Sequence, residues 1–381
     1  MGFLLTSILT LAIISGQLIR IPTGVGTVTF IDLAVIGSSF FLAYKNNFHF
    51  SKPPLFLQFF MGFLIVGLLS LVITPIKLMS HEFLNSLSYL IRLFFYVSLS
   101  ILLMHKNLSD FRYKIGSSLL FSGITLSFLG ILQFILFPDL MALSKDGWDP
   151  HFFRTVSTFL DPNFAGAYFV LTILILFQIK INKKWQFLSF IVVYLALLTT
   201  FSRSSYSMFL ISGISLSFFQ KSKKIFFSVL ILFLFLLISF QIYTQVVARP
   251  KGISREQSAS FRLSTWTQGL IIFQNSPILG IGYNSYRYAI RDYNLADQQF
   301  IKSHGSSSND SSLLFVAATT GVVGLSLYFL FLFTLIKYSL KSNFVLTSAI
   351  LGLLIHSTFT NSLFYPPILL WILLMSIYKS P

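Results

Sequence analysis

The sequence predicts an all-α, polytopic membrane protein with about twelve spanning helices and one large extracytoplasmic loop. Of its 381 residues, 55% are hydrophobic and 10% are charged, whereas soluble domains carry roughly 25% charged residues. Long apolar runs recur from end to end, and a bilayer span needs about 20 such residues. This composition excludes a soluble enzyme, a disordered chain and a nucleic-acid-binding domain. The net charge of +16 is therefore assigned to basic residues that contact membrane lipids at the headgroups.

The candidate spans follow one another along the chain with mostly short joins. Residues 1–19 lack the basic region and the cleavage site of a signal peptide, so we expect them to form an uncleaved first span. The candidate spans lie near 2–19, 27–44, 54–75, 83–104, 115–137, 162–179, 185–201, 204–219, 225–246, 311–336, 343–360 and 363–378.

The basic residues predict the orientation of these spans. If the N-terminus is cytoplasmic, every inner join carries lysine or arginine, and the short outer joins hold little beyond Arg20, Lys77 and Arg203. Short cytoplasmic loops are rich in Lys and Arg, so we expect both termini in the cytoplasm. The inner basic residues are Lys45, Lys52, Lys106, Arg112, Lys114, Lys180, Lys183, Lys184, Lys221, Lys223, Lys224, Lys337, Lys341 and Lys379.

The span map divides the chain into three parts. Residues 1–246 are expected to form an N-terminal bundle of about nine spans, 247–310 a large extracytoplasmic loop with short helices, and 311–381 about three C-terminal spans. Long loops cross the membrane regardless of their charge, so topology does not explain the arginines of this loop and we expect them to serve function. They are Arg249, Arg255, Arg262, Arg287 and Arg291.

No metal or other cofactor is expected. The chain has no cysteine, which excludes disulfides, thiolate nucleophiles and cysteine-ligated metals. Its six histidines are scattered, without a pair at the spacing of metal ligands.

Two polar stretches at the predicted outer face precede apolar spans. In the first, Asp161-Pro162-Asn163 is typical of a helix start, with Asp161 as N-cap and Pro162 at the first helical position. This stretch is either only a cap, or a place where Arg154 and Asn163 offer polar groups to a substrate.

In the second polar stretch, Ser202 and Arg203 join two spans with almost no loop. That arginine either extends to the headgroups or binds phosphate, and we favour phosphate.

Two further polar stretches belong to the large loop and its end. Arg262 and Trp266 are one helical turn apart and share a face. The run 277–282, Pro-Ile-Leu-Gly-Ile-Gly, is expected to break that helix. No strand precedes this Gly-x-Gly, so a dinucleotide-binding fold is rejected.

The last stretch contains His304, Asn309 and Asp310 and leads into a span with Gly321-Val-Val-Gly324. By itself, Asp310 is best explained as a helix N-cap. The triplet 309–311 also fits an N-glycosylation acceptor.

One arginine lies inside a predicted span. Arg92 falls in the middle of the fourth span, where a charge is costly. It either faces an internal cavity, which we favour, or shows that the span boundary is displaced. Asp32, at the start of the second span, is interpreted as a cap.

The order, side and spacing of these four stretches resemble the O-antigen ligase and O-antigen polymerase family of bacterial membrane glycosyltransferases, over residues 150–340. The resemblance implies a GT-C-like helical fold in the bacterial inner (cytoplasmic) membrane, with an active site that faces outward. It also implies a glycan donor linked to a polyprenyl diphosphate such as undecaprenyl diphosphate, and a glycan or lipid acceptor in lipopolysaccharide or another cell-envelope polysaccharide.

The sequence departs from the family at one position. Ligases of the family carry a His-Asn pair nine residues before Gly-x-x-Gly, and the corresponding positions here are Asp310 and Ser311. His304 lies upstream and is not assumed to replace that histidine. The departure suits a polymerase or a divergent member better than a strict ligase.

The residue types match the chemistry that the resemblance implies. Arginines bind phosphate through a fixed fork of donors, so Arg203 and Arg262 are expected to bind the diphosphate and stabilise its departure. Asp310 or His304 would take the proton of the acceptor hydroxyl. Nearby arginines would keep Asp310 ionised and weaken it as a base, which favours a positioning role. The expected substrate-binding residues are Arg154, Asn163, Ser202, Trp266, Arg287 and Asn309.

The alternative function is a flippase or transporter that carries the lipid-linked oligosaccharide without reacting it. Twelve spans also describe many transporters, but these place polar sites at the midplane and show repeated halves. The polar residues of this chain gather in one outer loop instead, so we favour the glycosyltransferase.

Overall fold

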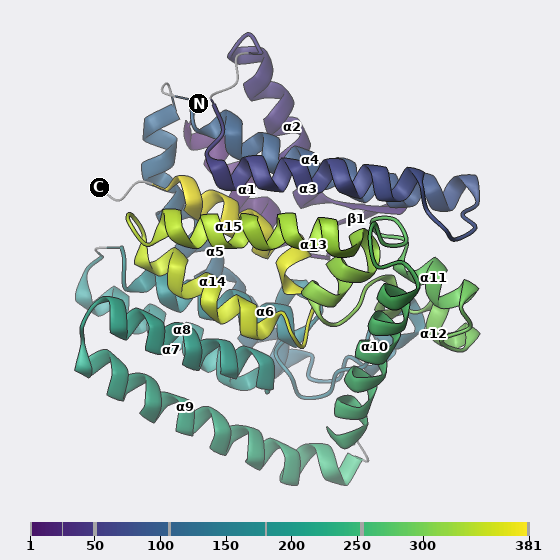
Figure 1. Cartoon of the computed structure of the whole chain (residues 1–381). Helices are drawn as coiled ribbons and strands as arrows, with labels where there is room; N and C mark the ends of the chain where they lie inside the picture. The colour runs from purple at the N-terminus through teal and green to yellow at the C-terminus, as the bar shows by residue number, and fades with distance from the viewer. Residues whose placement is uncertain are drawn as a thin grey trace. The chain divides into compact units, whose positions relative to one another are not determined.

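The computed structural model describes residues 2–24, 26–48, 52–105, 108–179, 181–251 and 255–378, with only the backbone for 255–259. The predicted inner residues Lys106, Lys180 and Lys379, and the side chain of Arg255, lie outside the described part. The described chain is predominantly helical (Figure 1).

In the described part of the chain, a helix overlaps each of the twelve predicted apolar segments, and the large loop adds three more. The helices are α1 (Gly2–Ser15), α2 (Phe30–Lys45), α3 (Leu55–Val72), α4 (Ser80–Leu103), α5 (Ser109–Leu136), α6 (Pro162–Leu176), α7 (Lys183–Thr199), α8 (Arg203–Phe219), α9 (Lys223–Tyr243), α10 (Arg255–Asn275), α11 (Tyr286–Asp292), α12 (Gln298–Lys302), α13 (Ser312–Ser339), α14 (Phe344–His356) and α15 (Pro366–Ile377).

Five of the helical segments in the described chain are long and apolar enough to cross a membrane. They contain α3, α4, α5, α9 and α13, and they confirm the predicted polytopic membrane protein. Other apolar helices, such as α14 with 13 residues and α15 with 12, are shorter than the roughly 20 residues of a full span. The number of twelve spans and the positions of the termini therefore stay predictions.

The all-α prediction missed one small sheet. Strands β1 (Arg20–Thr23) and β2 (Gly26–Thr29) pair antiparallel, with Arg20 opposite Thr29 and Thr23 opposite Gly26. The segment is short and leads directly into α2, so the apolar pattern of the second span concealed it.

The chain forms two compact units. Unit 1 contains Met1–Leu18, Asp110–Ala259 and Ser339–Pro381, and unit 2 contains Ile19–Ser109 and Ser260–Tyr338. The three parts predicted from the sequence, divided at 246 and 310, describe membrane topology, whereas the two units describe compact packing. The three-part division stays a prediction.

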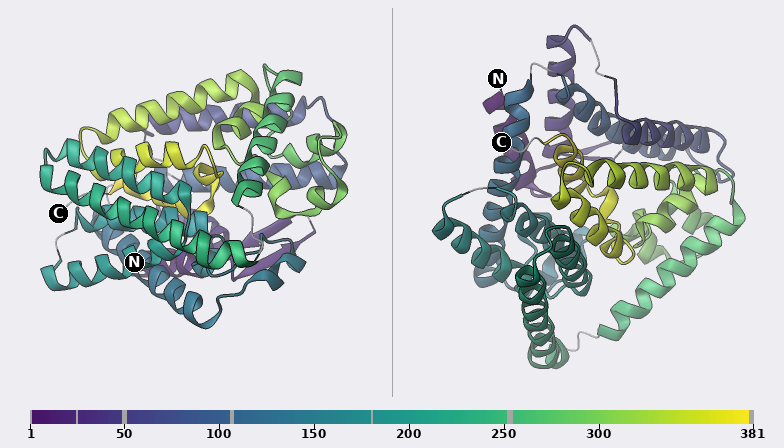
Figure 2. Two further views of the ribbon diagram at one scale, coloured as in Figure 1. Left: turned by 90° about the horizontal axis from the view of Figure 1, so that it is seen from below. Right: turned by 60° about the vertical axis from the view of Figure 1, so that its left-hand side comes forward.

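In unit 1, α8 is the central helix. It packs against α6, α9 and α14, while α6 also packs against α7; the helices α7, α8 and α9 lie side by side (Figures 1 and 2). Only 11% of the most apolar window in the α9 segment is buried within the protein, which is typical of a helix that faces lipid. The stretch between α5 and α6 folds back onto the end of α7, where the Thr155 N–H donates to the Thr199 carbonyl at 2.9 Å.

In unit 2, α13 is broken at Gly321, whose backbone has φ 64° and ψ −167°. The loop 277–282 lies beside the break and supplies the missing hydrogen bonds. The Val322 N–H donates to the Pro277 carbonyl at 2.8 Å, and the Ile281 N–H to the Ala318 carbonyl at 3.1 Å. Backbone groups inside a membrane protein must be satisfied internally, so this loop stabilises the broken helix. The same loop follows the end of α10 at Asn275, which confirms the predicted helix break.

Unit 2 also explains the arginine inside the fourth span. Arg92 lies in the middle of α4, and its Nη2 is 3.0 Å from Asp32 Oδ2. Asp32 accepts the Thr29 N–H at 3.0 Å, which confirms it as a cap of α2, and the Tyr96 hydroxyl at 3.2 Å. Helix α4 covers nearly all of the predicted fourth span, and the charge of Arg92 is paired with Asp32. That Arg92 faces an internal cavity stays a prediction.

Candidate functional site

In unit 1, the turn between α7 and α8 is held by a buried arginine. Arg154 is 9% exposed. Its Nε donates to the Thr200 carbonyl at 2.8 Å and its Nη2 to the Phe201 carbonyl at 3.4 Å. The Phe201 ring stacks on Tyr243, with 4.1 Å between ring centroids. Arg154 thus fixes the backbone that directly precedes α8.

The starts of α6 and α8 are joined by side-chain hydrogen bonds. Asp161 Oδ1 accepts the N–H groups of Asn163 at 2.6 Å and Phe164 at 3.0 Å, which confirms Asp161 as the cap of α6. Ser202 caps α8 by accepting the Ser205 N–H at 3.3 Å, and its hydroxyl donates to Asn163 Oδ1 at 2.8 Å. The structure therefore brings Asn163 and Ser202 into contact, although they come from separate polar stretches.

Arg203 is the first residue of α8 and is exposed. Its guanidinium carbon lies 5.7 Å from the centroid of the Phe240 ring. Among the residues that the structure describes, no hydrogen bond or ion pair is formed by this side chain. Its five donors are thus available to an anion.

In unit 2, Asp310 is fixed to α10 at the helical turn that begins with Arg262. Thr265 Oγ1 lies 2.9 Å from Asp310 Oδ2 and 2.9 Å from the Arg262 carbonyl oxygen. Thr265 is buried, whereas Arg262 and Asp310 are half-buried. The structure therefore brings together two predicted site residues from opposite ends of the large loop. Trp266, half-buried, is the next residue on α10.

Asn309 holds the same junction from the inside. It is fully buried, and its Nδ2 donates to the Thr265 carbonyl and, at 2.8 Å, to the Tyr286 hydroxyl. That hydroxyl in turn donates to the Thr265 carbonyl at 3.3 Å. Burial raises the pKa of Tyr286, so its hydroxyl keeps the proton that it donates. A Cβ at position 269 would lie 2.7 Å from Asn309 Nδ2, which explains the glycine there.

Arg287 fixes the loop that carries His304. Its Nε donates to Ser306 Oγ at 2.8 Å and its Nη2 to the Ser303 carbonyl at 2.8 Å. Burial lowers the pKa of Arg287 from a value so high that the group stays charged at neutral pH. His304 itself is exposed at the start of the short helix η6 (His304–Ser307).

Several polar residues of these clusters were missed by the sequence reasoning. Thr265 and Tyr286 hold Asp310 and Asn309 in unit 2, and Ser205 and His356 complete the cluster at Asn163 in unit 1. Thr265 could have been found, because it lies three residues after Arg262 and shares its helical face. His356 carries no local signal, since it ends an apolar helix far along the chain.

The described residues include no group of three or more His, Asp or Glu side chains that could hold a metal ion. A reaction without a metal stays a prediction.

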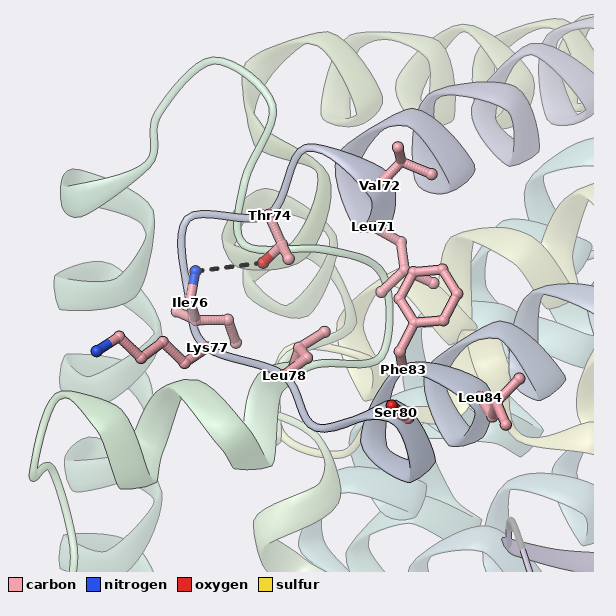
Figure 3. A pocket seen from close by; sticks show the side chains of 9 residues that line it. All are labelled: Leu71, Val72, Thr74, Ile76, Lys77, Leu78, Ser80, Phe83 and Leu84. Carbon is pink, nitrogen blue, oxygen red and sulfur yellow. Dashed lines mark hydrogen bonds between the residues drawn. The ribbon is translucent and has the colours of Figure 1, made fainter.

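A pocket of about 680 Å³ lies in unit 2 between the end of α3 and the start of α4 (Figure 3). Its lining is mainly apolar and includes Leu71, Phe83 and Leu84. Lys77 belongs to the lining, but its side chain extends away from Leu71 and Phe83 (Figure 3). The pocket contains none of the predicted site residues.

These features define a helical membrane protein whose polar side chains gather at the starts of apolar helices. Residues 187–329 match the family model described as O-antigen ligase, which confirms the resemblance to the O-antigen ligase and polymerase family. The matched segment begins within α7, ends within α13 and contains Arg203, Arg262 and Asp310. A comparison with curated proteins gave no match.

Proposed function

We propose that the protein is a membrane glycosyltransferase that transfers or polymerises a glycan from a polyprenyl-diphosphate carrier onto an acceptor hydroxyl. The observation that carries the proposal is the junction of Asp310 with the helical turn of Arg262, through Thr265 Oγ1 at 2.9 Å, inside the segment that matches the O-antigen ligase family. A carboxylate held at a helical turn that carries an arginine would supply charges that glycosyl transfer from a diphosphate requires.

In the proposed reaction, the bond between the anomeric carbon and the diphosphate oxygen breaks, and the acceptor oxygen forms a new bond to that carbon. The lipid diphosphate leaves with the bonding electrons. Arg203 and Arg262 would bind this group and stabilise its growing charge, because a guanidinium offers fixed, permanently charged donors. The exposed position of Arg203, without a hydrogen bond to the described chain, supports this role.

The acceptor hydroxyl must lose a proton as the new bond forms. Asp310 or His304 would accept it. Thr265 Oγ1 lies within hydrogen-bond distance of the Asp310 carboxylate, and this contact fixes the position of the carboxylate beside α10. We therefore assign Asp310 to positioning and to stabilising positive charge at the sugar ring, and we keep the exposed His304 as a second candidate base.

Asp310 and Ser311 stand where the ligases of the family carry His-Asn, so we propose a polymerase or a divergent member. Its donor would be an undecaprenyl-diphosphate-linked glycan and its acceptor a glycan or lipid of the cell envelope. The protein would work in the bacterial inner membrane, without a metal, with both termini cytoplasmic and the active site outward.

The test is release of lipid diphosphate by the purified protein in vesicles supplied with a polyprenyl-diphosphate oligosaccharide and a glycan acceptor. Arg203→Ala and Arg262→Ala should each lower the rate by about a hundredfold, as expected for loss of a charge-stabilising donor. Arg249→Ala is the matched control. Of the loop arginines, Arg262 and Arg287 carry the proposed roles, whereas Arg249 is exposed and, among the described residues, bonds to Gln245 of its own helical segment at 3.3 Å. Its rate should equal that of the wild type.

Two results would contradict the proposal. If labelled lipid crosses the bilayer and no lipid diphosphate is released, the protein is a flippase. If Arg249→Ala lowers the rate as much as Arg203→Ala, the loss reflects positive charge in general and Arg203 has no specific role.

A further inference from the structure

We infer that His356 is a positioning residue for the proposed transfer reaction and acts through Asn163. The inference rests on the proposed function. His356 is the last residue of α14, and it is fully buried. Its Nε2 lies 3.2 Å from the Asn163 carbonyl oxygen and 3.4 Å from Ser205 Oγ. Since α14 packs against both α6 and α8, this histidine joins the starts of those two helices.

The partners of His356 determine which ring nitrogen carries a proton. A carbonyl oxygen only accepts hydrogen bonds, so Nε2 carries a hydrogen and donates it to Asn163. Ser205 Oγ also lies 3.1 Å from that carbonyl and 2.9 Å from Ser202 Oγ. Its hydroxyl has a single hydrogen. Ser202 Oγ is the nearer of the two acceptors, so we assign the hydrogen of Ser205 to Ser202.

The direction of the next hydrogen bond follows. Ser202 Oγ accepts the backbone N–H of Ser205 at 3.3 Å as well as the Ser205 hydroxyl. Its own hydrogen is donated to Asn163 Oδ1 at 2.8 Å, which is nearer than Ser204 Oγ at 3.1 Å. The amide oxygen of Asn163 faces Ser202, and the amide nitrogen with its two hydrogens lies on the other side of the group.

The amide nitrogen of Asn163 has no hydrogen-bond partner among the described residues, and the side chain is half-buried. It is a neutral donor, held in place, near the start of α8 where Arg203 follows Ser202. An oxygen of the sugar or of the diphosphate is the ligand that such a donor fits. His356 thus acts through Asn163 and does not itself touch the substrate.

A purely structural role for His356 makes different predictions, which two substitutions separate. Gln at position 356 can place an amide N–H where the Nε2 hydrogen lies, whereas Leu fills the volume without a donor. Ser357→Ala is the matched control. Ser357 is buried beside His356, and among the described residues its hydroxyl donates to the carbonyl of Leu354 in α14, at 2.9 Å.

The experiment measures kcat and KM for lipid-diphosphate release, with the melting temperature of each variant. His356→Leu should lower kcat/KM about tenfold, the effect of one misplaced hydrogen bond, and His356→Gln should recover most of it. Asn163→Ala should cause a similar loss, and adding His356→Leu to Asn163→Ala should cause none beyond it, because residues that act through one another are not additive. Ser357→Ala should match the wild type.

The inference would be overturned if the double variant showed a loss of kcat/KM equal to the product of the two single losses. It would also be overturned if His356→Gln had the melting temperature of the wild type but a kcat/KM as low as that of His356→Leu. If His356→Leu does not fold, His356→Gln and Asn163→Ala still decide, since both should fold. Wild-type protein that releases no lipid diphosphate would refute the proposed function itself, which separates that failure from failure of the inference.

Discussion

Gly321→Ala is expected to destabilise the protein by about 3–5 kcal/mol. The backbone of Gly321, at φ 64° and ψ −167°, lies in a region that only glycine adopts readily, and another residue there costs about 1–3 kcal/mol. A Cβ would also lie 2.2 Å from the Ile278 carbonyl oxygen, which is backbone and cannot rotate away. The loop must then separate from α13 and lose the bonds of Val322 to Pro277 and of Ile281 to Ala318, each worth about 1 kcal/mol.

The assay is thermal unfolding of the purified protein in detergent, combined with lipid-diphosphate release. Gly37→Ala is the matched control: Gly37 lies in α2 of the same unit, and a Cβ there would meet no atom within 4 Å. That variant should be unchanged or more stable by about 0.5–1 kcal/mol. Gly321→Ala should also lower activity, because Asp310 lies two residues before the first half of the broken helix, which begins at Ser312. Wild-type stability in Gly321→Ala would refute the reasoning.

Three further substitutions test single contacts. Thr265→Val keeps the side-chain shape and removes the hydroxyl beside Asp310. Its kcat should fall about tenfold while the melting temperature stays the same. An unchanged kcat would exclude a positioning role for Thr265. Arg92→Leu leaves the Asp32 carboxylate buried without its partner at 3.0 Å, so the free energy of unfolding should fall by about 3–5 kcal/mol. Adding Asp32→Asn to the same chain should restore most of this loss. Arg154→Leu removes charged donors from two backbone carbonyls and should cost about 1.5–3 kcal/mol of stability; unchanged stability with a raised KM would instead support direct substrate binding.

Features that depend on neighbouring residues could be predicted from the sequence. The cap at Asp161 with Pro162 in the first turn, and the end of α10 before the loop 277–282, both follow from local backbone preferences. The membrane class follows from composition, because no arrangement of so few charged residues could cover a water-exposed surface.

Contacts between distant segments could not be predicted. Thr265 reaches Asp310 across 45 residues, and His356 reaches Asn163 across 193. Neither pair has a sequence spacing that reports proximity, because packing of the helices brings them together. The break in α13 was hidden for another reason: glycine is common within membrane helices, and only the opposing loop shows that Gly321 leaves the helical conformation.

The caps of α6 and α8 differ in charge, and this difference indicates which helix start binds the diphosphate. Both helix starts carry a partial positive charge. At α6 the carboxylate of Asp161 offsets it, whereas at α8 the cap is the neutral Ser202, followed by Arg203. Under the proposed function, we therefore expect the diphosphate at the start of α8 and a sugar oxygen at Asn163. Ser202→Asp would keep a cap and add a negative charge beside Arg203.

If the assignment is correct, Ser202→Asp should raise the KM for the lipid-linked donor about tenfold or more, because a carboxylate next to the anion opposes binding. Ser222→Asp is the matched control. Ser222 caps α9 in the same unit and in the same way, by accepting the Ile225 N–H at 3.3 Å, and α9 starts without any predicted site residue. Its KM should equal that of the wild type. If Ser202→Asp has the KM of the wild type, the diphosphate does not bind at the start of α8, because a carboxylate at position 202 would repel an anion bound there.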